Sequence, residues 1–304
     1  MFNFKKKSVV LIVVALLILT AVSVVFAAGY DLTTVPSDAT INGAIFQAIA
    51  PSDPTGSGGF DAFLRTQADV SEKGYNNEMN NSDYEFDEVS GCCTHEITLA
   101  EIPEVLRQAD GIKYRIFELD INETNSAPLI TLDTVEIYEA ADGNICGYPF
   151  DGSATIPPCP AGTINTATMI YDMDAGENNF VVLDYDNNAG SGKRDLRLWV
   201  PDALFSQDPN CDYQSPDANL CTTYIVLYNE FGLDFDANAA SPLDTAHNTD
   251  DGFEEWGVPT EDIPTAISFS DISAGMQTGN FIWIGLAFLL LIVLTVGKLQ
   301  RNRA

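Results

Sequence analysis

The chain has 304 residues, of which 44 are acidic and only 14 are Lys or Arg, so its formal net charge is −30. An excess of acid this large excludes nucleic-acid binding, which requires a basic patch. The sequence has only two histidines and neither a G-x-S-x-G nucleophile motif nor a P-loop, and we expect no enzymatic activity.

Residues 1–27 are predicted to form a secretory signal peptide. Three lysines precede an unbroken apolar run from Val9 to Phe26, and the small residue Ala27 suits cleavage before Ala28. The apolar run is also long enough to remain as an uncleaved signal anchor. In either case, the sequence predicts that the chain is exported.

The region 28–257 is predicted to be one all-β domain, a β-sandwich or jelly roll. Short segments of alternating apolar and polar residues are separated by turn signals, and helical spacing occurs only over 101–109. The polar segment Glu72–Glu88 is expected to be a surface loop, and His95 to pack on an apolar strand face. The predicted strands are Ile41–Ile49, Phe60–Leu64, Thr94–Leu99, Ile112–Ile121, Leu129–Glu139, Thr168–Tyr171, Phe180–Tyr185, Leu196–Val200 and Thr223–Tyr228.

The C-terminal part is predicted to anchor the domain to a membrane. Residues 258–280 have the composition of a linker, 281–297 form a transmembrane or sorting helix, and 298–304 form a basic tail. The positive-inside rule places that tail in the cytoplasm. The domain is therefore expected at the cell surface, on the extracellular side, with the C-terminal helix as its contact with the membrane.

The exported part is far more acidic than the chain as a whole. Six of the 14 basic residues lie in the two ends, so eight remain against all 44 acidic residues, a formal charge of −36. Self-repulsion of this size favours bound cations, high external salt, or both. A solvated acidic surface, as in salt-adapted proteins, is the alternative, but the acids are grouped with Asn and Gly in turn-like clusters.

One of these clusters follows the ligand spacing of an EF-hand loop. Asp184, Asp186 and Asn188 alternate and Asp195 stands at the twelfth position, although Ala189 replaces the usual glycine. The flanking segments have the pattern of strands, not helices. We predict a calcium-type loop inside a sheet, because Ca²⁺ prefers sets of six to eight oxygen ligands.

Other oxygen-rich clusters are further candidates for Ca²⁺. Asp, Asn and Gly are also ordinary turn formers, so each cluster has a plain structural explanation, but we expect at least one cation in the domain. The additional candidate sets are Asp172, Asp174 and Asn178; Asp120, Asn122 and Asp133; and Asp250, Asp251 and Glu254.

Six cysteines lie in the exported part, where oxidation is expected. Cys146 with Cys159, and Cys211 with Cys221, each bracket a short loop, so local bridges are predicted. The adjacent Cys92 and Cys93 would then form a vicinal bridge or cross-link to a neighbouring protein. A zinc site is the competing interpretation, but the short paired spacings of such sites are absent.

Several short motifs, in order from Ile41 to Trp256, resemble an uncharacterised family of secreted, surface-anchored β-sandwich proteins. Members often carry a PEP-CTERM type sorting tail, but this chain has no Pro-Glu-Pro before its apolar segment, so removal and retention of the tail both remain open. The resemblance implies surface location and a compact domain without a known reaction. The motifs are Asn42-Gly43-Ala44-Ile45-Phe46, Gly74-Tyr75-Asn76, Leu119-Asp120-Ile121-Asn122, Leu132-Asp133, Ile137-Tyr138, Tyr171-Asp172-Met173-Asp174-Ala175-Gly176, Gly190-Ser191-Gly192 and Asp251-Gly252-Phe253-Glu254-Glu255-Trp256.

The sequence therefore predicts a structural or adhesive surface protein stabilised by calcium. Its alternative is a carbohydrate-binding surface module, in which Trp199 stacks on a sugar ring. The partner would then be a surface glycan, or otherwise a neighbouring surface protein. A glycan-acting enzyme is disfavoured because Glu254 and Glu255 are adjacent on a predicted strand and point to opposite faces, while Trp256 is expected to anchor that strand.

Overall fold

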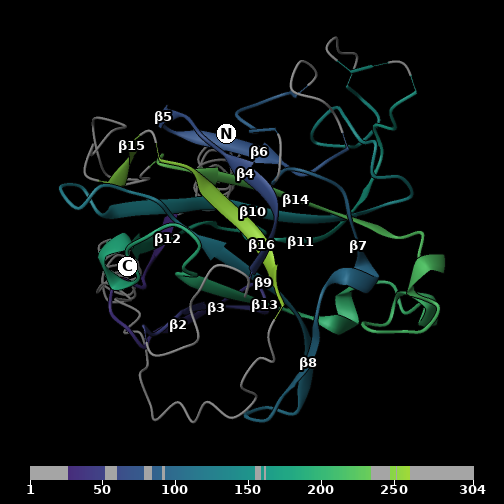
Figure 1. Ribbon diagram of the computed structural model, residues 1–304, viewed down its shortest axis with the longest axis horizontal. Helices are drawn as coiled ribbons and strands as arrows, with labels where there is room; N and C mark the ends of the chain where they lie inside the picture. Colours follow the sequence, from purple (N-terminus) through teal and green to yellow (C-terminus); the bar gives the residue numbers. More distant parts are fainter. Residues whose placement is uncertain are drawn as a thin grey trace, which may run out of the picture. The chain divides into compact units, whose positions relative to one another are not determined.

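The computed structural model describes residues 27–51, 60–78, 84–90, 93–154, 159–160, 162–233, 247–250 and 252–260. All of them belong to a compact unit from Met1 to Ser270. They form mostly β-strands arranged in sheets, as predicted (Figure 1). None of the helices in these ranges is long and apolar enough to cross a membrane. The predicted signal peptide up to residue 26, the predicted membrane helix 281–297 and the basic tail 298–304 lie outside the described residues.

The first sheet has seven strands. β11 (Thr168–Asp172) pairs with β10, and β7 (Ile97–Thr98) pairs with β14. β1 runs parallel to β12, and every other pair in the sheet is antiparallel. The order of the other strands is β1 (Ala27–Asp31), β12 (Asn178–Asp184), β10 (Leu129–Ala140), β14 (Tyr224–Phe231) and β6 (Glu72–Tyr75).

The second sheet also has seven strands and is antiparallel throughout. β8 (Glu104–Arg107) pairs with β9. A separate two-stranded ribbon consists of β5 (Asp69–Val70) and β15 (Thr249–Asp250), which lie side by side in Figure 1. The order of the other strands is β2 (Asp38–Ile41), β3 (Ala44–Ala48), β13 (Leu196–Pro201), β9 (Ile112–Asp120), β16 (Glu254–Pro259) and β4 (Phe60–Thr66).

The two large sheets share one apolar core, the arrangement of a β-sandwich. On β13 the side chains of Leu196, Leu198 and Val200 enter this core, while Trp199 lies on the opposite face. The two-residue period of a strand produces this division. Trp256 of β16 is fully buried in the same core, so it anchors the last strand as predicted.

The predicted strand Ile41–Ile49 is two strands in the structure. Asn42 and Gly43 have φ angles of 48° and 91° and connect β2 to β3. Positive φ at both central residues is the requirement of a type I′ hairpin turn, for which Asn-Gly is a preferred pair. The continuous apolar run around Asn42 and Gly43 thus concealed a hairpin.

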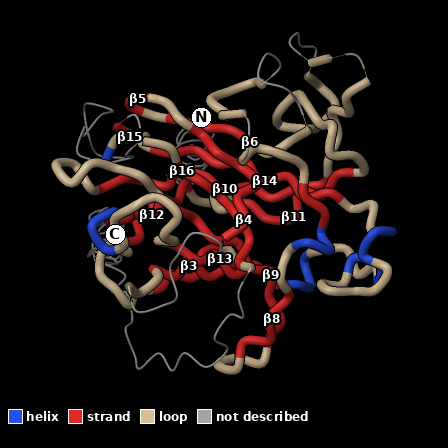
Figure 2. Tube along the Cα trace, viewed as in Figure 1, coloured by secondary structure: helices blue, strands red, loops and turns tan. Residues whose placement is uncertain are grey.

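The predicted helix over 101–109 is wrong. Leu99–Glu101 forms one 3-10 turn, η1, and the chain then enters β8. Pro103 lies between them, and proline lacks the amide that a continuing helix needs and disfavours helical geometry in the preceding residue. Only short 3-10 turns occur as helical structure among the described residues (Figure 2).

The predicted surface loop Glu72–Glu88 and the predicted packing of His95 also need correction. Glu72–Tyr75 form β6, and the Tyr75 ring is fully buried, 4.9 Å from the Phe150 ring. Tertiary packing of this aromatic side chain outweighs the polar composition around it. The His95 side chain is exposed, and its ring nitrogens lie against backbone carbonyl oxygens.

Two predicted disulfides are confirmed. Cys146 bonds Cys159 with a Cα–Cα distance of 5.6 Å, and Cys211 bonds Cys221 with a Cα–Cα distance of 4.8 Å. Cys93 is also disulfide-bonded, and Cys92 lies outside the described residues.

Candidate metal centre

The predicted EF-hand-like loop connects strands of different sheets and does not lie inside one sheet. It runs from the end of β12 to the start of β13 and crosses between the two layers. Asp184 Oδ1 accepts a hydrogen bond from the Asp186 amide at 3.0 Å, and Asn188 Nδ2 donates to the Ile49 carbonyl at 2.7 Å. The Asp186 side chain accepts from Asn125. These three predicted ligands are used in forming the loop.

The second predicted set also forms a turn. Asp172 Oδ1 accepts from the Asp174 amide at 2.7 Å, and Asp174 Oδ1 accepts from the Asn179 amide at 2.7 Å. Burial is the main cause that raises the Asp174 pKa to about 6. Asn178 is the first residue of β12. The backbone amides satisfy these carboxylates, as expected for turn-forming residues.

The third predicted set is divided between the two sheets. Asp133 lies in β10, and its Oδ2 accepts from the Leu233 amide at 2.8 Å. Asp120 ends β9, and Asn122 donates from Nδ2 to the Phe253 carbonyl at 3.1 Å. Of this set, only Asp120 and Asn122 lie near the end of β9.

Buried carboxylates gather where β9 ends. The segment after β9, residues 121–124, passes directly beneath the start of β16: a Cβ added to Gly252 would be 1.6 Å from the Asn122 carbonyl oxygen. Glycine permits this contact because it has no side chain. The close approach brings acidic residues from β6, β9, β15, β16 and their connections to one end of the fold.

The first pair in this region is Asp120 and Asp195, both buried. The Gly192 amide donates to Asp120 Oδ2 at 2.6 Å, and the Ile121 amide donates to Asp195 Oδ2 at 2.9 Å. The Oδ1 atom of each residue has no hydrogen-bond partner. Burial is the largest cause that raises the pKa of Asp120 to about 7, and burial together with Asp120 raises the Asp195 pKa well above its usual value.

The second pair is Glu72 and Glu254, which are 1% and 0% exposed. Glu72 accepts hydrogen bonds from Thr66 Oγ1 at 2.5 Å and from the Ala68 amide at 3.0 Å. Glu254 Oε1 accepts from the Asn122 amide at 3.3 Å, whereas its Oε2 has no partner. Burial raises the pKa of both groups, and the charge of Glu72 raises that of Glu254 further.

The third pair is Glu123 and Asp250. Glu123 is 5% exposed, and neither of its carboxylate oxygens has a hydrogen-bond partner. Asp250 Oδ2 accepts from both the amide and the hydroxyl of Thr124, while its Oδ1 is unpartnered. Burial and then the Asp250 carboxylate raise the Glu123 pKa to about 9.

The basic residues of this part of the chain are occupied elsewhere. Eight Lys and Arg lie between residues 28 and 260, and all are described. Arg65 pairs with Glu255 and Arg115 with Asp202, while Arg194 and Arg197 both pair with Glu118. None of the ion pairs among the described residues includes a member of the three carboxylate pairs. Lys193 forms none of these ion pairs, but its positive charge lowers the pKa of Asp195.

Sequence reasoning found only part of this region. Asp120 with Asn122, Asp195, and Asp250 with Glu254 were candidates in three different predicted sets, and Asp251 lies outside the described residues. Glu72 and Glu123 were missed. In the structure Glu72 is the inward-facing first residue of the short strand β6, which the polar sequence around it did not indicate. The opposite orientation of Glu254 and Glu255 is confirmed, since Glu254 meets Glu72 and Glu255 meets Arg65.

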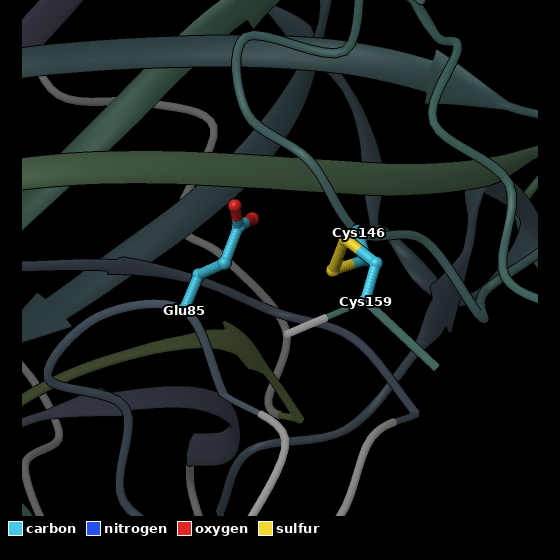
Figure 3. A group of neighbouring side chains, drawn as sticks. All are labelled: Glu85, Cys146 and Cys159. Atoms are coloured by element: carbon cyan, nitrogen blue, oxygen red, sulfur yellow. A yellow bond between two sulfur atoms is a disulfide. The ribbon is translucent and has the colours of Figure 1, made fainter. Parts of the chain in front are cut away.

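One further group has the spacing of a metal site. Within the described ranges, Glu85, Cys146 and Cys159 are the only three acidic, Cys or His residues whose ligand atoms all lie within 4.8 Å of one another. Figure 3 shows the Glu85 carboxylate beside the disulfide. Sulfur in a disulfide is not a thiolate ligand. Glu85 instead accepts hydrogen bonds from the Gly147 and Tyr148 amides at 2.8 and 3.1 Å and holds this loop.

Trp199 is buried and unsuited to stacking on a sugar. It is 2% exposed, its Nε1 donates to Gln47 Oε1 at 2.8 Å, and Tyr114 contacts its ring edge-on. Trp199 is thus a packing residue on the outer face of the second sheet.

Comparisons with protein-family models, with curated proteins and with solved structures found no match to this chain.

Proposed function

We propose that this chain is a structural or adhesive cell-surface protein whose disulfide-containing β-sandwich is stabilised by calcium. In this proposal the signal peptide exports the domain and the C-terminal helix 281–297 tethers it. The domain requires no reaction centre. It would present a rigid, acidic surface to a neighbouring surface protein or glycan.

The observation that carries the proposal is the set of buried carboxylates around the end of β9. Five carboxylates there, Asp120, Glu123, Asp195, Asp250 and Glu254, have buried oxygen atoms without a hydrogen-bond partner, and all of these residues except Asp250 are themselves buried. Unpaired buried charge is strongly destabilising, and its usual remedies are an opposite charge, a metal ion or protonation. The chain's own cations are engaged elsewhere, so protonation or an external cation must offset this charge. The strongly acidic composition of the domain favours the cation.

The test is thermal unfolding of the purified full chain at pH 7.5, in excess chelator and in millimolar CaCl₂. A ligand at 100 times its dissociation constant stabilises the folded state by about 2.7 kcal/mol. For a domain of this size we expect the unfolding midpoint to rise by roughly 5–10 °C. An identical midpoint in chelator and in calcium would refute the proposal.

A further inference from the structure

We propose that the buried acid cluster, defined as Glu72, Glu123, Asp250 and Glu254, is a Ca²⁺ site. This inference rests on the proposed function and assigns the ion to one place in the fold. The cluster is built from β6, the segment after β9, the ribbon strand β15 and the first residue of β16.

Unpartnered oxygens inside the cluster are the primary observation. Both oxygens of Glu123 and Oε2 of Glu254 lack a donor, although these residues are 5% and 0% exposed. A proton shared between Glu123 and Asp250 would satisfy only one Glu123 oxygen. A divalent cation accepts several carboxylate oxygens at once and offsets the mutual repulsion of the acids.

Electrostatic repulsion connects the four side chains. The pKa of Glu123 is raised by the charges of Asp250 and Glu72, and that of Glu254 by the charges of Glu72 and Glu123. Glu123 thus links the Glu72–Glu254 pair to Asp250. The four groups act as one electrostatic unit, although no three of them have oxygens within 4.8 Å of one another. Ion binding would draw the two pairs together by side-chain rotation.

The donor set selects the class of cation. All four ligands are carboxylates, and hard cations prefer such oxygens, whereas zinc favours nitrogen and sulfur. The acids come from four separate segments and offer irregular geometry. Calcium tolerates variable coordination of six to eight oxygens, while magnesium requires a near-ideal octahedron.

An ion at this position would connect the ribbon to both large sheets. Glu72 belongs to the first sheet and Glu254 to the second, while Asp250 lies in the ribbon. The ribbon itself consists of two paired residues on each strand. Calcium would therefore fix the ribbon against both sheets.

The experiment compares the full-length chain with Glu123→Gln and Glu254→Gln, using CaCl₂ as the probe. Glutamine has nearly the shape of protonated glutamate but supplies no charge. Glu177→Gln is the matched control, because Glu177 is exposed and outside the cluster. The readouts are calorimetric titration with CaCl₂ and the unfolding midpoint in chelator, in CaCl₂ and in NaCl of equal ionic strength.

We expect wild type and Glu177→Gln to bind calcium and to gain the same increase in midpoint. Glu123→Gln and Glu254→Gln should lose most of that increase and bind calcium at least tenfold more weakly. In chelator, Glu123→Gln should unfold at a temperature equal to or above that of wild type, because a buried charge has been removed. This last comparison separates loss of the site from failure to fold.

Two outcomes would overturn the inference in different ways. If calcium stabilises both cluster variants as much as wild type, the ion is bound elsewhere and only the assignment of the site is wrong. If wild type gains nothing from calcium beyond the effect of NaCl, both the site and the proposed function are wrong.

Discussion

Among single residues, some buried charges have a partner of opposite charge and others have none. Arg115 is 2% exposed, and its Nε donates to Asp202 at 2.7 Å while Nη1 donates to the Leu99 and Ile102 carbonyls. Glu118 is fully buried and accepts from both Arg194 and Arg197. The chain thus pairs some buried charges with ions of opposite sign, whereas the unpartnered oxygens of Glu123 and Glu254 have no such partner.

Glu88 provides a pH-dependence test away from the buried acid cluster. Burial, opposed by the amides of Tyr75 and Phe86, raises its pKa from 4.5 to about 7. The folded state then holds a proton that the unfolded state releases, so this contribution to stability is complete below about pH 4.5 and is lost as pH rises to about 7.

We expect the unfolding free energy measured in chelator to decrease across this pH window. Glu88→Gln should flatten that dependence. It should not be more stable than wild type at pH 7.5, because the glutamine Nε2 cannot accept the hydrogen bond that one of the Tyr75 and Phe86 amides donates to Glu88. Chemical denaturation at several pH values measures the free energy of unfolding of each variant, with Glu177→Gln as control. An unchanged slope in Glu88→Gln would show that other groups cause the decrease.

At the scale of elements, close contacts between segments position the carboxylates. β9 contributes Asp120 at its last residue, and the next residues reach the ribbon through hydrogen bonds from Thr124 to Asp250. The turn at Asn42 and Gly43 is another close contact between segments, because the Asn42 side chain donates a hydrogen bond to the Met173 carbonyl at 2.8 Å. Turns and strand ends thus set the distances between the two sheets.

Gly252→Ala should be strongly destabilising. The added Cβ would overlap the Asn122 carbonyl oxygen, so the start of β16 would have to move away from residues 121–124. We expect chemical denaturation to show a free energy of unfolding lower by about 3 kcal/mol. Calcium should also stabilise this variant less than it stabilises wild type.

Gly43→Ala is the informative comparison for Gly252→Ala. Gly43 has φ +91° and open space around it, so alanine there should cost only about 1 kcal/mol of backbone strain. Equal effects of the two substitutions would mean that the contact with Asn122 is unimportant.

At the scale of the whole molecule, two disulfides stabilise long connections between strands. Cys146 and Cys159 close the connection between β10 and β11, and Cys211 and Cys221 close the connection between β13 and β14. Both connections contain little regular structure, so cross-links replace the stabilisation that strand pairing gives elsewhere.

Replacing both Cys211 and Cys221 by Ser should lower the free energy of unfolding by about 2–4 kcal/mol, since the unfolded chain gains entropy when the loop is opened. Chemical denaturation with and without calcium measures this change. The increase in the free energy of unfolding on adding calcium should remain, because the disulfide and the buried acid cluster involve different residues. A lost calcium response in this variant would indicate that the two are coupled.

Sequence alone determined the all-β class, most strand positions and the two local disulfides, because each depends on residues close together in the chain. Two-residue alternation marks β9, β10 and β13 directly, and short spacing brings the cysteines together. The prediction of one continuous strand over Ile41–Ile49 was wrong, because its apolar residues outweighed the Asn-Gly turn signal within it.

Only the tertiary structure decided which carboxylates meet. Asp195 was grouped with Asp184 by spacing, but in the structure Asp120 is its stronger acidic neighbour and Asp184 the weaker one. Glu72, Glu123 and Glu254 are far apart in sequence and meet because two sheets and a ribbon converge. Local patterns record the period of a strand, whereas burial and electrostatic neighbours arise from long-range packing, which no spacing in this sequence encodes.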